Sequence, residues 1–165
     1  MATNPVDVQS ALTQIGEAAR ASDWRHAAQI ADQALQSGAV HPGLYNTRAI
    51  WAEMEERHQD ALDDYLRAVL YAPQHPMLLK AIGLSLVRVN RAAEALGYLD
   101  QAIALSPDAA AYFFKGWAHE AQANKDEARQ AYERAIEFDP QHAEALCSLG
   151  LMAGRNGETE AAALM

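Results

Sequence analysis

The sequence predicts an all-α protein in which antiparallel helix pairs are stacked one after another. Half of the 165 residues are hydrophobic and alanine is abundant, and this composition favours helix over disorder. Prolines recur at Pro73, Pro107 and Pro140, which are 34 and 33 residues apart. A period of this length indicates a repeat protein whose unit is one helix pair.

Small residues follow the same period as the prolines. Glycines recur at Gly83, Gly116 and Gly150, and each of the three prolines is preceded by alanines 12 and 5 residues earlier. Small side chains allow two helices to approach closely. A proline ends the second helix of the pair because it has no backbone N–H to donate. The pattern therefore predicts two closely packed helices in each repeat.

Each predicted helix is supported by the residues at its ends. Pro42 and Pro76 suit the first turn of a helix, and Asp60 places negative charge in a first turn, where the helix dipole favours it. Residues 154–157, which read Gly-Arg-Asn-Gly, predict a turn. We expect helices over residues 8–20, 24–37, 42–55, 58–71, 76–89, 92–105, 109–122, 125–138 and 143–155, followed by a helical stub from residue 158.

This pattern resembles the tetratricopeptide repeat (TPR) family. Residues 109–142 match best, with the family's signature residues at positions 4, 8, 20, 24, 27 and 32 of the unit: Tyr112, Gly116, Ala128, Tyr132, Ala135 and Pro140. Two positions depart from the family, because Lys115 replaces a leucine at position 7 and His119 replaces a tyrosine at position 11. The resemblance implies a right-handed superhelical solenoid of antiparallel helix pairs, a TPR-like alpha-alpha superhelix.

The resemblance covers nearly the whole chain, so residues 1–165 are expected to form a single TPR domain of about 4.5 repeats. The expected repeats are residues 8–41, 42–75, 76–108, 109–142 and a partial unit at 143–165. Because the fifth unit stops early, our hypothesis is that the chain is the N-terminal part of a longer protein. The alternative is that a short final helix suffices as a cap. Self-association through this apolar end is a further alternative.

Composition and motifs argue against several classes of function. The net charge of −9 is not the broad basic footprint of a nucleic-acid-binding protein. No apolar stretch approaches the roughly 20 residues that span a bilayer. Cys147 is the only cysteine, so no intrachain disulfide can form. We therefore expect a cytoplasmic protein with no nucleic acid or membrane partner.

No residue pattern in the sequence predicts an active site, a cofactor site or a metal site. His41, His75 and His142 each occupy position 34, in the turns between repeats. Equivalent positions in neighbouring repeats lie on the order of 10 Å apart, which is too far for one zinc ion with bonds near 2 Å. We expect these histidines to be exposed turn residues, and we expect the chain itself not to be an enzyme.

The family resemblance also implies a binding groove, lined by the first helix of each repeat at about positions 2, 5, 9 and 12. The residues that match these positions are Asn46, Ile50, Glu53, Met77, Lys80, Leu84, Val87, Phe113, Trp117, Glu120 and Leu151. They are more apolar and aromatic than basic, so we do not expect a clamp for a terminal carboxylate. For Phe113 and Trp117 the alternative is burial between hairpins with no contact to a partner.

The sequence therefore predicts a non-catalytic scaffold that binds a peptide or helix in an apolar, aromatic groove. The alternative is that the array is the N-terminal helper domain of a larger bacterial enzyme, of the sulfotransferase, glycosyltransferase or oxygenase type. Similar repeat arrays are often fused to such domains, and the catalytic part would then lie beyond Met165. The identity of a protein partner is not encoded in any motif of the sequence.

Overall fold

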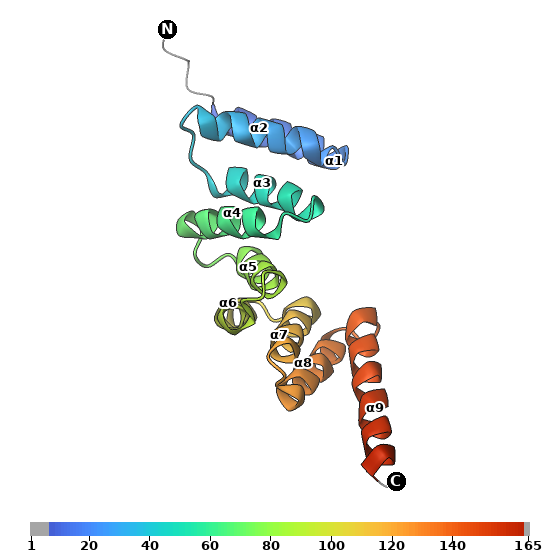
Figure 1. Cartoon of the computed structure of the whole chain (residues 1–165). Helices are drawn as coiled ribbons and strands as arrows, with labels where there is room; N and C mark the ends of the chain where they lie inside the picture. Colours follow the sequence, from blue (N-terminus) through green and yellow to red (C-terminus); the bar gives the residue numbers. More distant parts are fainter. Residues whose placement is uncertain (1–6, 164–165) are drawn as a thin grey trace. The chain divides into compact units, whose positions relative to one another are not determined.

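A computed structural model describes residues 7–163 of the chain, and side chains from residue 7 to residue 154. The described residues form helices and no strand, which confirms the predicted all-α class (Figure 1). The helices are α1 (Val8–Arg20), α2 (Trp24–Gln36), α3 (Pro42–Met54), α4 (His58–Tyr71), α5 (Pro76–Arg88), α6 (Ala92–Leu105), α7 (Ala109–Ala121), α8 (Lys125–Phe138) and α9 (Ala143–Ala163).

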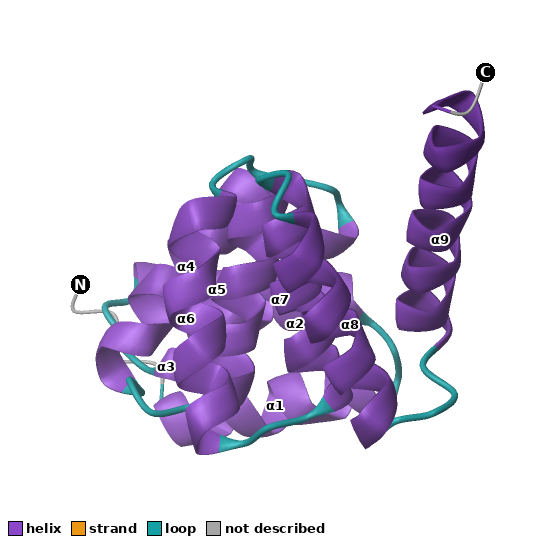
Figure 2. Cartoon of the chain, turned by 90° about the horizontal axis from the view of Figure 1, so that it is seen from below, coloured by secondary structure: helices purple, strands orange, loops and turns teal. Residues whose placement is uncertain are grey.

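The chain divides into two compact units, which comprise residues 1–85 (unit 1) and residues 86–165 (unit 2). In unit 1, α1 packs on α2, α2 on α3, and α3 on α4. In unit 2, α6 packs on α7, α7 on α8, and α8 on α9. Short loops join the helices (Figure 2), and helices joined by short loops pack as antiparallel neighbours in each of these pairs.

Small residues form the contact between the two helices of a repeat, as the sequence predicts. Ala49 on α3 and Ala61 and Ala68 on α4 are completely buried. In unit 2, Gly116 on α7 lies so close to α8 that a Cβ atom there would be 2.5 Å from the ring of Tyr132. Side chains larger than a methyl group would therefore hold these helices apart.

The turn between the two helices has the same conformation in four repeats. A residue other than glycine adopts a positive φ of 58° to 62° at position 15 of each unit: Ser22, Glu56, Asn90 and Ala123. In the second repeat, Glu56 N–H donates to the carbonyl of Glu53 (3.0 Å) and Arg57 N–H to that of Ala52 (2.8 Å). This is a Schellman motif, which satisfies the last carbonyls of the helix. Those two bonds offset the roughly 1–2 kcal/mol cost of the left-handed residue.

The predicted turn at residues 154–157 and the separate helical stub from residue 158 were wrong. Helix α9 continues without a break to Ala163, although Gly157 stands at the position that is left-handed in the earlier repeats. Residues 143–163 contain no proline, and a glycine inside a helix costs only about 1 kcal/mol. The other eight helices begin where the sequence predicts and end within one residue of the predicted position.

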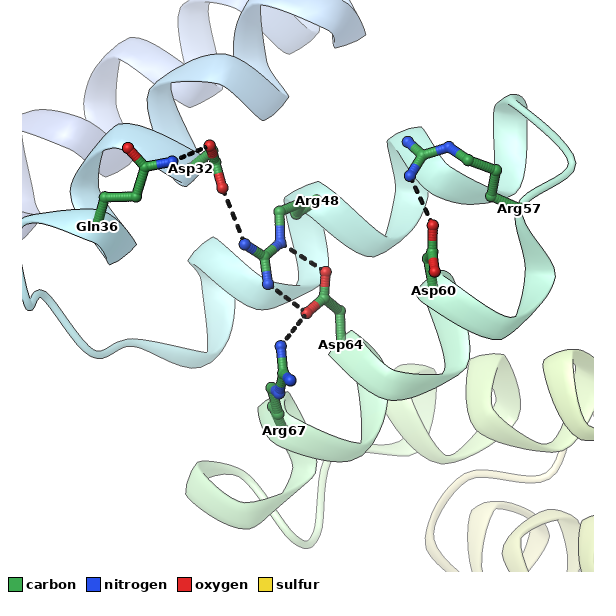
Figure 3. A network of polar contacts seen from close by, with 7 residues as sticks. All are labelled: Asp32, Gln36, Arg48, Arg57, Asp60, Asp64 and Arg67. Carbon is green, nitrogen blue, oxygen red and sulfur yellow. Dashed lines mark hydrogen bonds and ion pairs between the residues drawn. The ribbon is translucent and has the colours of Figure 1, made fainter.

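An ion-pair network links the first two repeats inside unit 1 (Figure 3). Arg48 on α3 donates to Asp32 on α2 (2.9 Å) and makes two bonds of 2.6 Å to Asp64 on α4. Arg67 also contacts Asp64 (3.2 Å), whose side chain is only 7% exposed. A single guanidinium at position 7 therefore connects three helices.

The lysine at position 7 of the fourth repeat makes the equivalent contact in unit 2. Lys115 on α7 donates to Asp100 on α6 at 2.7 Å. Asp100 and Asp32 both stand on the second helix of the preceding repeat, at position 25. The departure from leucine at position 7 is thus explained, because a cation there pairs with an aspartate of the repeat before it.

The substitution Gly116→Ala tests the close helix contact. We expect it to lower the free energy of unfolding by roughly 1–3 kcal/mol, because the new methyl group overlaps the buried Tyr132 ring. The measurement is urea unfolding followed by circular dichroism. Gly97→Ala is the matched control, because a methyl group added at Gly97 would meet nothing within 4 Å and alanine favours helix. Equal effects of the two substitutions would contradict the close contact.

The substitution Arg48→Ala tests the ion-pair network. We expect a loss of about 1–3 kcal/mol in the free energy of unfolding, because Asp64 is buried and loses its two shortest bonds. Arg57→Ala removes an exposed pair with Asp60 and should cost less than about 1 kcal/mol. Thermal unfolding of both variants makes the comparison, and a larger effect at Arg57 would argue against the network.

Candidate functional site

Unit 1 contains a hollow of about 570 Å³, in the range of volumes typical of ligand sites. The hollow is lined by residues of α3, α4 and α5 and of the loops that precede α3 and α5. We call it the unit 1 hollow. Its lining residues are His41, Pro42, Gly43, Asn46, Ile50, Tyr65, Ala72, His75, Met77, Leu78 and Ala81. The lining is predominantly apolar and contains no carboxylate.

The start of α3 fixes one rim of the unit 1 hollow. Pro42 occupies the first turn, and the His41 ring caps the helix, with its Nδ1 accepting the Gly43 N–H at 3.0 Å. Because Nδ1 accepts, the neutral ring carries its proton on Nε2, which can donate a hydrogen bond. His41 is half-buried, so the prediction that it is an exposed turn residue was wrong.

The histidine at the same position of the fourth repeat is also a helix cap. His142 Nδ1 accepts the Ala145 N–H at 3.3 Å at the start of α9, and its side chain is only 15% exposed. The expectation of an exposed histidine was therefore wrong here too, whereas His75 is exposed. A histidine can replace the usual aspartate or serine at this position because its Nδ1 lone pair accepts a backbone N–H.

Three of the residues expected in the groove of unit 1 line the unit 1 hollow. They are Asn46, Ile50 and Met77, at positions 5 and 9 of one repeat and position 2 of the next. Met77 is 62% exposed at the rim. Expected groove positions of two successive repeats therefore meet at one surface.

The other expected groove residues of unit 1 are engaged elsewhere. Glu53 accepts a hydrogen bond of 2.5 Å from the Ser85 hydroxyl and lies 3.1 Å from Nδ1 of His58. Lys80 is buried and Leu84 is half-buried, and neither lines the hollow. Burial and internal bonds leave these side chains less surface to offer a partner.

In unit 2 the expected groove residues range from buried to exposed. Val87 is buried, and Phe113 packs against the cluster that contains Tyr132. Trp117 is half-buried, and Leu151 is 59% exposed on α9. The acid at position 12, Glu120, accepts a hydrogen bond of 2.7 Å from the hydroxyl of Tyr132. These side chains therefore differ in how much surface each of them exposes.

Sequence reasoning missed several residues of the unit 1 hollow, notably Tyr65, His41 and His75. The family resemblance points only to positions on the first helix, whereas Tyr65 is on α4 and the histidines are in the loops. The available signal is the large aromatic at position 24 together with the histidine at position 34. Both recur in the fourth repeat as Tyr132 and His142.

A smaller hollow of about 220 Å³ lies in unit 2, beside His119. Nδ1 of His119 is buried and makes no hydrogen bond to any residue that the structure describes. Burial lowers the pKa of His119, and the nearby positive charge of Lys115 lowers it further. A neutral imidazole at this helix contact therefore replaces the tyrosine that the family favours at position 11.

Among the described side chains, from residue 7 to residue 154, no group of histidine, cysteine or acidic residues is arranged to hold a metal ion. No helix within residues 7–163 is both long enough and apolar enough to cross a membrane.

Two family models, each described as a tetratricopeptide repeat, match the chain over residues 80–143 and 131–163. The chain belongs to the tetratricopeptide repeat family. The position numbers used above to compare the repeats are therefore those of the tetratricopeptide repeat. No curated protein gives a significant match to this TPR chain.

Solved structures share the fold at low sequence identity. MamA (residues 41 to the end) from Desulfovibrio magneticus RS-1 is 20% identical with a TM-score of 0.81, covering 94% of this chain and 88% of its own. YrrB, described as a TPR protein with an unusual peptide-binding site, is 21% identical with a TM-score of 0.76, covering 81% and 70%. The first TPR domain of Spaghetti (RPAP3), bound to an HSP90 peptide, is 23% identical with a TM-score of 0.66, covering 70% and 93%. These likenesses confirm the TPR solenoid fold.

The lowered pKa of His119 predicts a pH dependence of stability. The unfolded chain binds this proton more tightly than the folded chain, so the stabilisation is fully present above the unfolded pKa of about 6.5 and is lost as the pH falls below it. The variant His119→Leu should lose less stability than the wild type over that fall in pH. Chemical unfolding at a series of pH values measures this, and parallel curves for the two proteins would contradict it.

Proposed function

We propose that this TPR chain is a non-catalytic scaffold that binds a segment of a partner protein in the unit 1 hollow. The observation that carries the proposal is the hollow itself, about 570 Å³ in volume and lined by two successive repeats. Ile50, Tyr65, Met77 and Leu78 supply apolar surface to it. Burial of apolar surface is the main driving force for such binding, at roughly 25 cal/mol per Å².

Polar groups at the rim would fix the orientation of a bound segment. Asn46 offers an amide donor and an acceptor, and the Nε2–H of His41 is a further donor. A peptide backbone presents the complementary groups. The absence of carboxylates from the lining means that the chain's net negative charge is not concentrated at this surface. Two proteins of the same fold, YrrB and RPAP3, are described with a peptide-binding site or a bound peptide.

The remaining expectations stay predictions. They include contact of a partner with Phe113, Trp117 and Leu151, self-association through the C-terminal end, and a cytoplasmic location. The alternative of a helper domain for a catalytic domain beyond Met165 also stays a prediction. A scaffold of the proposed kind is compatible with either arrangement, because it binds a segment and carries out no chemistry.

The proposal predicts that Ile50→Arg weakens peptide binding. Peptides selected from a random display library on the purified chain are titrated by calorimetry against the wild type and the variant. We expect at least a tenfold loss of affinity, which corresponds to about 1.4 kcal/mol, because a charged side chain replaces apolar surface inside the hollow.

Leu70→Arg is the matched control for this experiment. Leu70 is 75% exposed and does not line the unit 1 hollow, so the same change in charge and size there should leave the affinity unaltered. Circular dichroism of both variants verifies their helicity. Selected peptides that bind the Ile50→Arg variant as tightly as the wild type would show that the hollow is not the binding site.

A further inference from the structure

The second and fourth repeats place the same side chains around position 5 of their first helices. Tyr65 and Tyr132 both stand at position 24, and His75 and His142 both stand at position 34. In unit 1, Tyr65 and His75 line the hollow. By repeat position, the residues around position 5 in unit 2 are therefore the same as in the wall of the unit 1 hollow, although His75 is exposed and His142 is half-buried.

Position 5 itself differs between the two repeats, and the difference decides whether the space is filled. In unit 2 the residue is Phe113, whose ring centroid lies 5.6 Å from that of Tyr132 and 5.2 Å from that of His142. The interplanar angles are 34° and 36°. Ring pairs at such separations attract each other beyond the burial of their area.

In unit 1 the corresponding residue is Asn46, which is shorter and polar. Its amide cannot reach as far as a phenyl ring or make the same ring contacts. Asn46, Tyr65 and His75 all line the 570 Å³ hollow there. The chain thus shows in one unit which side chain fits a space that it leaves open in the other.

We propose that the unit 1 hollow binds an aromatic side chain of the phenylalanine type, presented by the partner segment. The bound ring lies between Tyr65 and His75, as the ring of Phe113 lies between Tyr132 and His142. This inference rests on the proposed function of the hollow and adds the chemistry of the occupant.

Other residues of the lining suit a phenyl ring. Ile50 and Met77 supply apolar walls, and a methionine thioether contacts aromatic rings favourably. Asn46 remains at the side of the hollow, where its amide can bond the backbone of the segment that carries the ring. An aliphatic side chain would bury similar area but would lack the ring contacts, so we expect an aromatic preference of about two- to tenfold.

The decisive variant is Asn46→Phe, which gives the second repeat the ring that the fourth repeat already has. The probes are N-acetyl-phenylalanine methylamide and its leucine counterpart, titrated into the full chain and followed by two-dimensional NMR. In the wild type, the phenylalanine probe should shift the signals of Tyr65 and His75 at concentrations two- to tenfold lower than the leucine probe. In Asn46→Phe these shifts should disappear because the chain's own ring fills the space.

Asn46→Ala is the matched control, because it removes the amide and leaves the hollow open. It should retain the shifts caused by the phenylalanine probe. Equal binding of the two probes to the wild type, or undiminished binding of the phenylalanine probe to a helical Asn46→Phe variant, would overturn the inference.

A variant in unit 2 keeps the inference testable if Asn46→Phe does not fold. Phe113→Ala opens the equivalent space between Tyr132 and His142, and the phenylalanine probe should then shift the signals of these two residues, which it leaves unchanged in the wild type. Failure of the probe to enter that space in a folded Phe113→Ala variant would overturn the inference.

The outcomes separate the inference from the proposed function. If selected peptides bind in an Ile50-dependent manner but show no aromatic preference, the inference fails and the proposed function stands. If the phenylalanine probe enters the hollow but no peptide binds there, the proposed function fails and the chemistry assigned to the space stands.

Discussion

The close approach of the two helices in each repeat is the constraint on which the rest of the structure depends. Fully buried alanines form this contact in unit 1, and in unit 2 a glycine lies directly against the ring of Tyr132. Because the centre of the contact accepts only small residues, the large side chains at positions 4 and 24 must lie to its sides. The walls of the unit 1 hollow are a consequence of this arrangement, since Tyr65 stands at position 24. The strained left-handed residue in each turn is tolerated for the same reason, because the packed helices hold it in place.

Contacts between successive repeats are more varied than those within a repeat. Arg48 and Lys115 each reach back to an aspartate on the preceding helix, where the family pattern has a leucine. Such pairs are directional, so they favour one neighbour and one register more strongly than an apolar contact does. A hollow lies beside each of the two cations, Arg48 and Lys115, because a polar side chain fills less of the adjoining space than a leucine would. The specific ion pairs therefore come with less complete packing between the repeats.

The repeat register made most of the fold predictable from the sequence. Helix ends are encoded locally by prolines, caps and acidic first turns, which is why eight helices end within one residue of their predicted positions. The ninth helix is different, because a turn at Gly157 depends on a packed partner rather than on local signals alone. The register also identified Asn46, Ile50 and Met77, which line the unit 1 hollow. It could not identify His41 as the cap of α3 and a lining residue of the hollow, because the sequence does not distinguish an exposed loop histidine from one that caps a helix.

Position 5 is filled by a phenyl ring in the fourth repeat and by a shorter amide in the second, and this one difference explains why the second repeat has a hollow there. Phe113 completes the packing of its hairpin, whereas Asn46 leaves an apolar space open at the same place. An open apolar space forgoes the dispersion contacts and area burial that a ring would supply. Because Phe113 fills this position in the fourth repeat and Asn46 does not fill it in the second, the second repeat is packed less well there. Local departures from good packing are typical of functional sites in proteins. In the proposal made above, the polar Asn46 is the feature that turns a core position into a binding position.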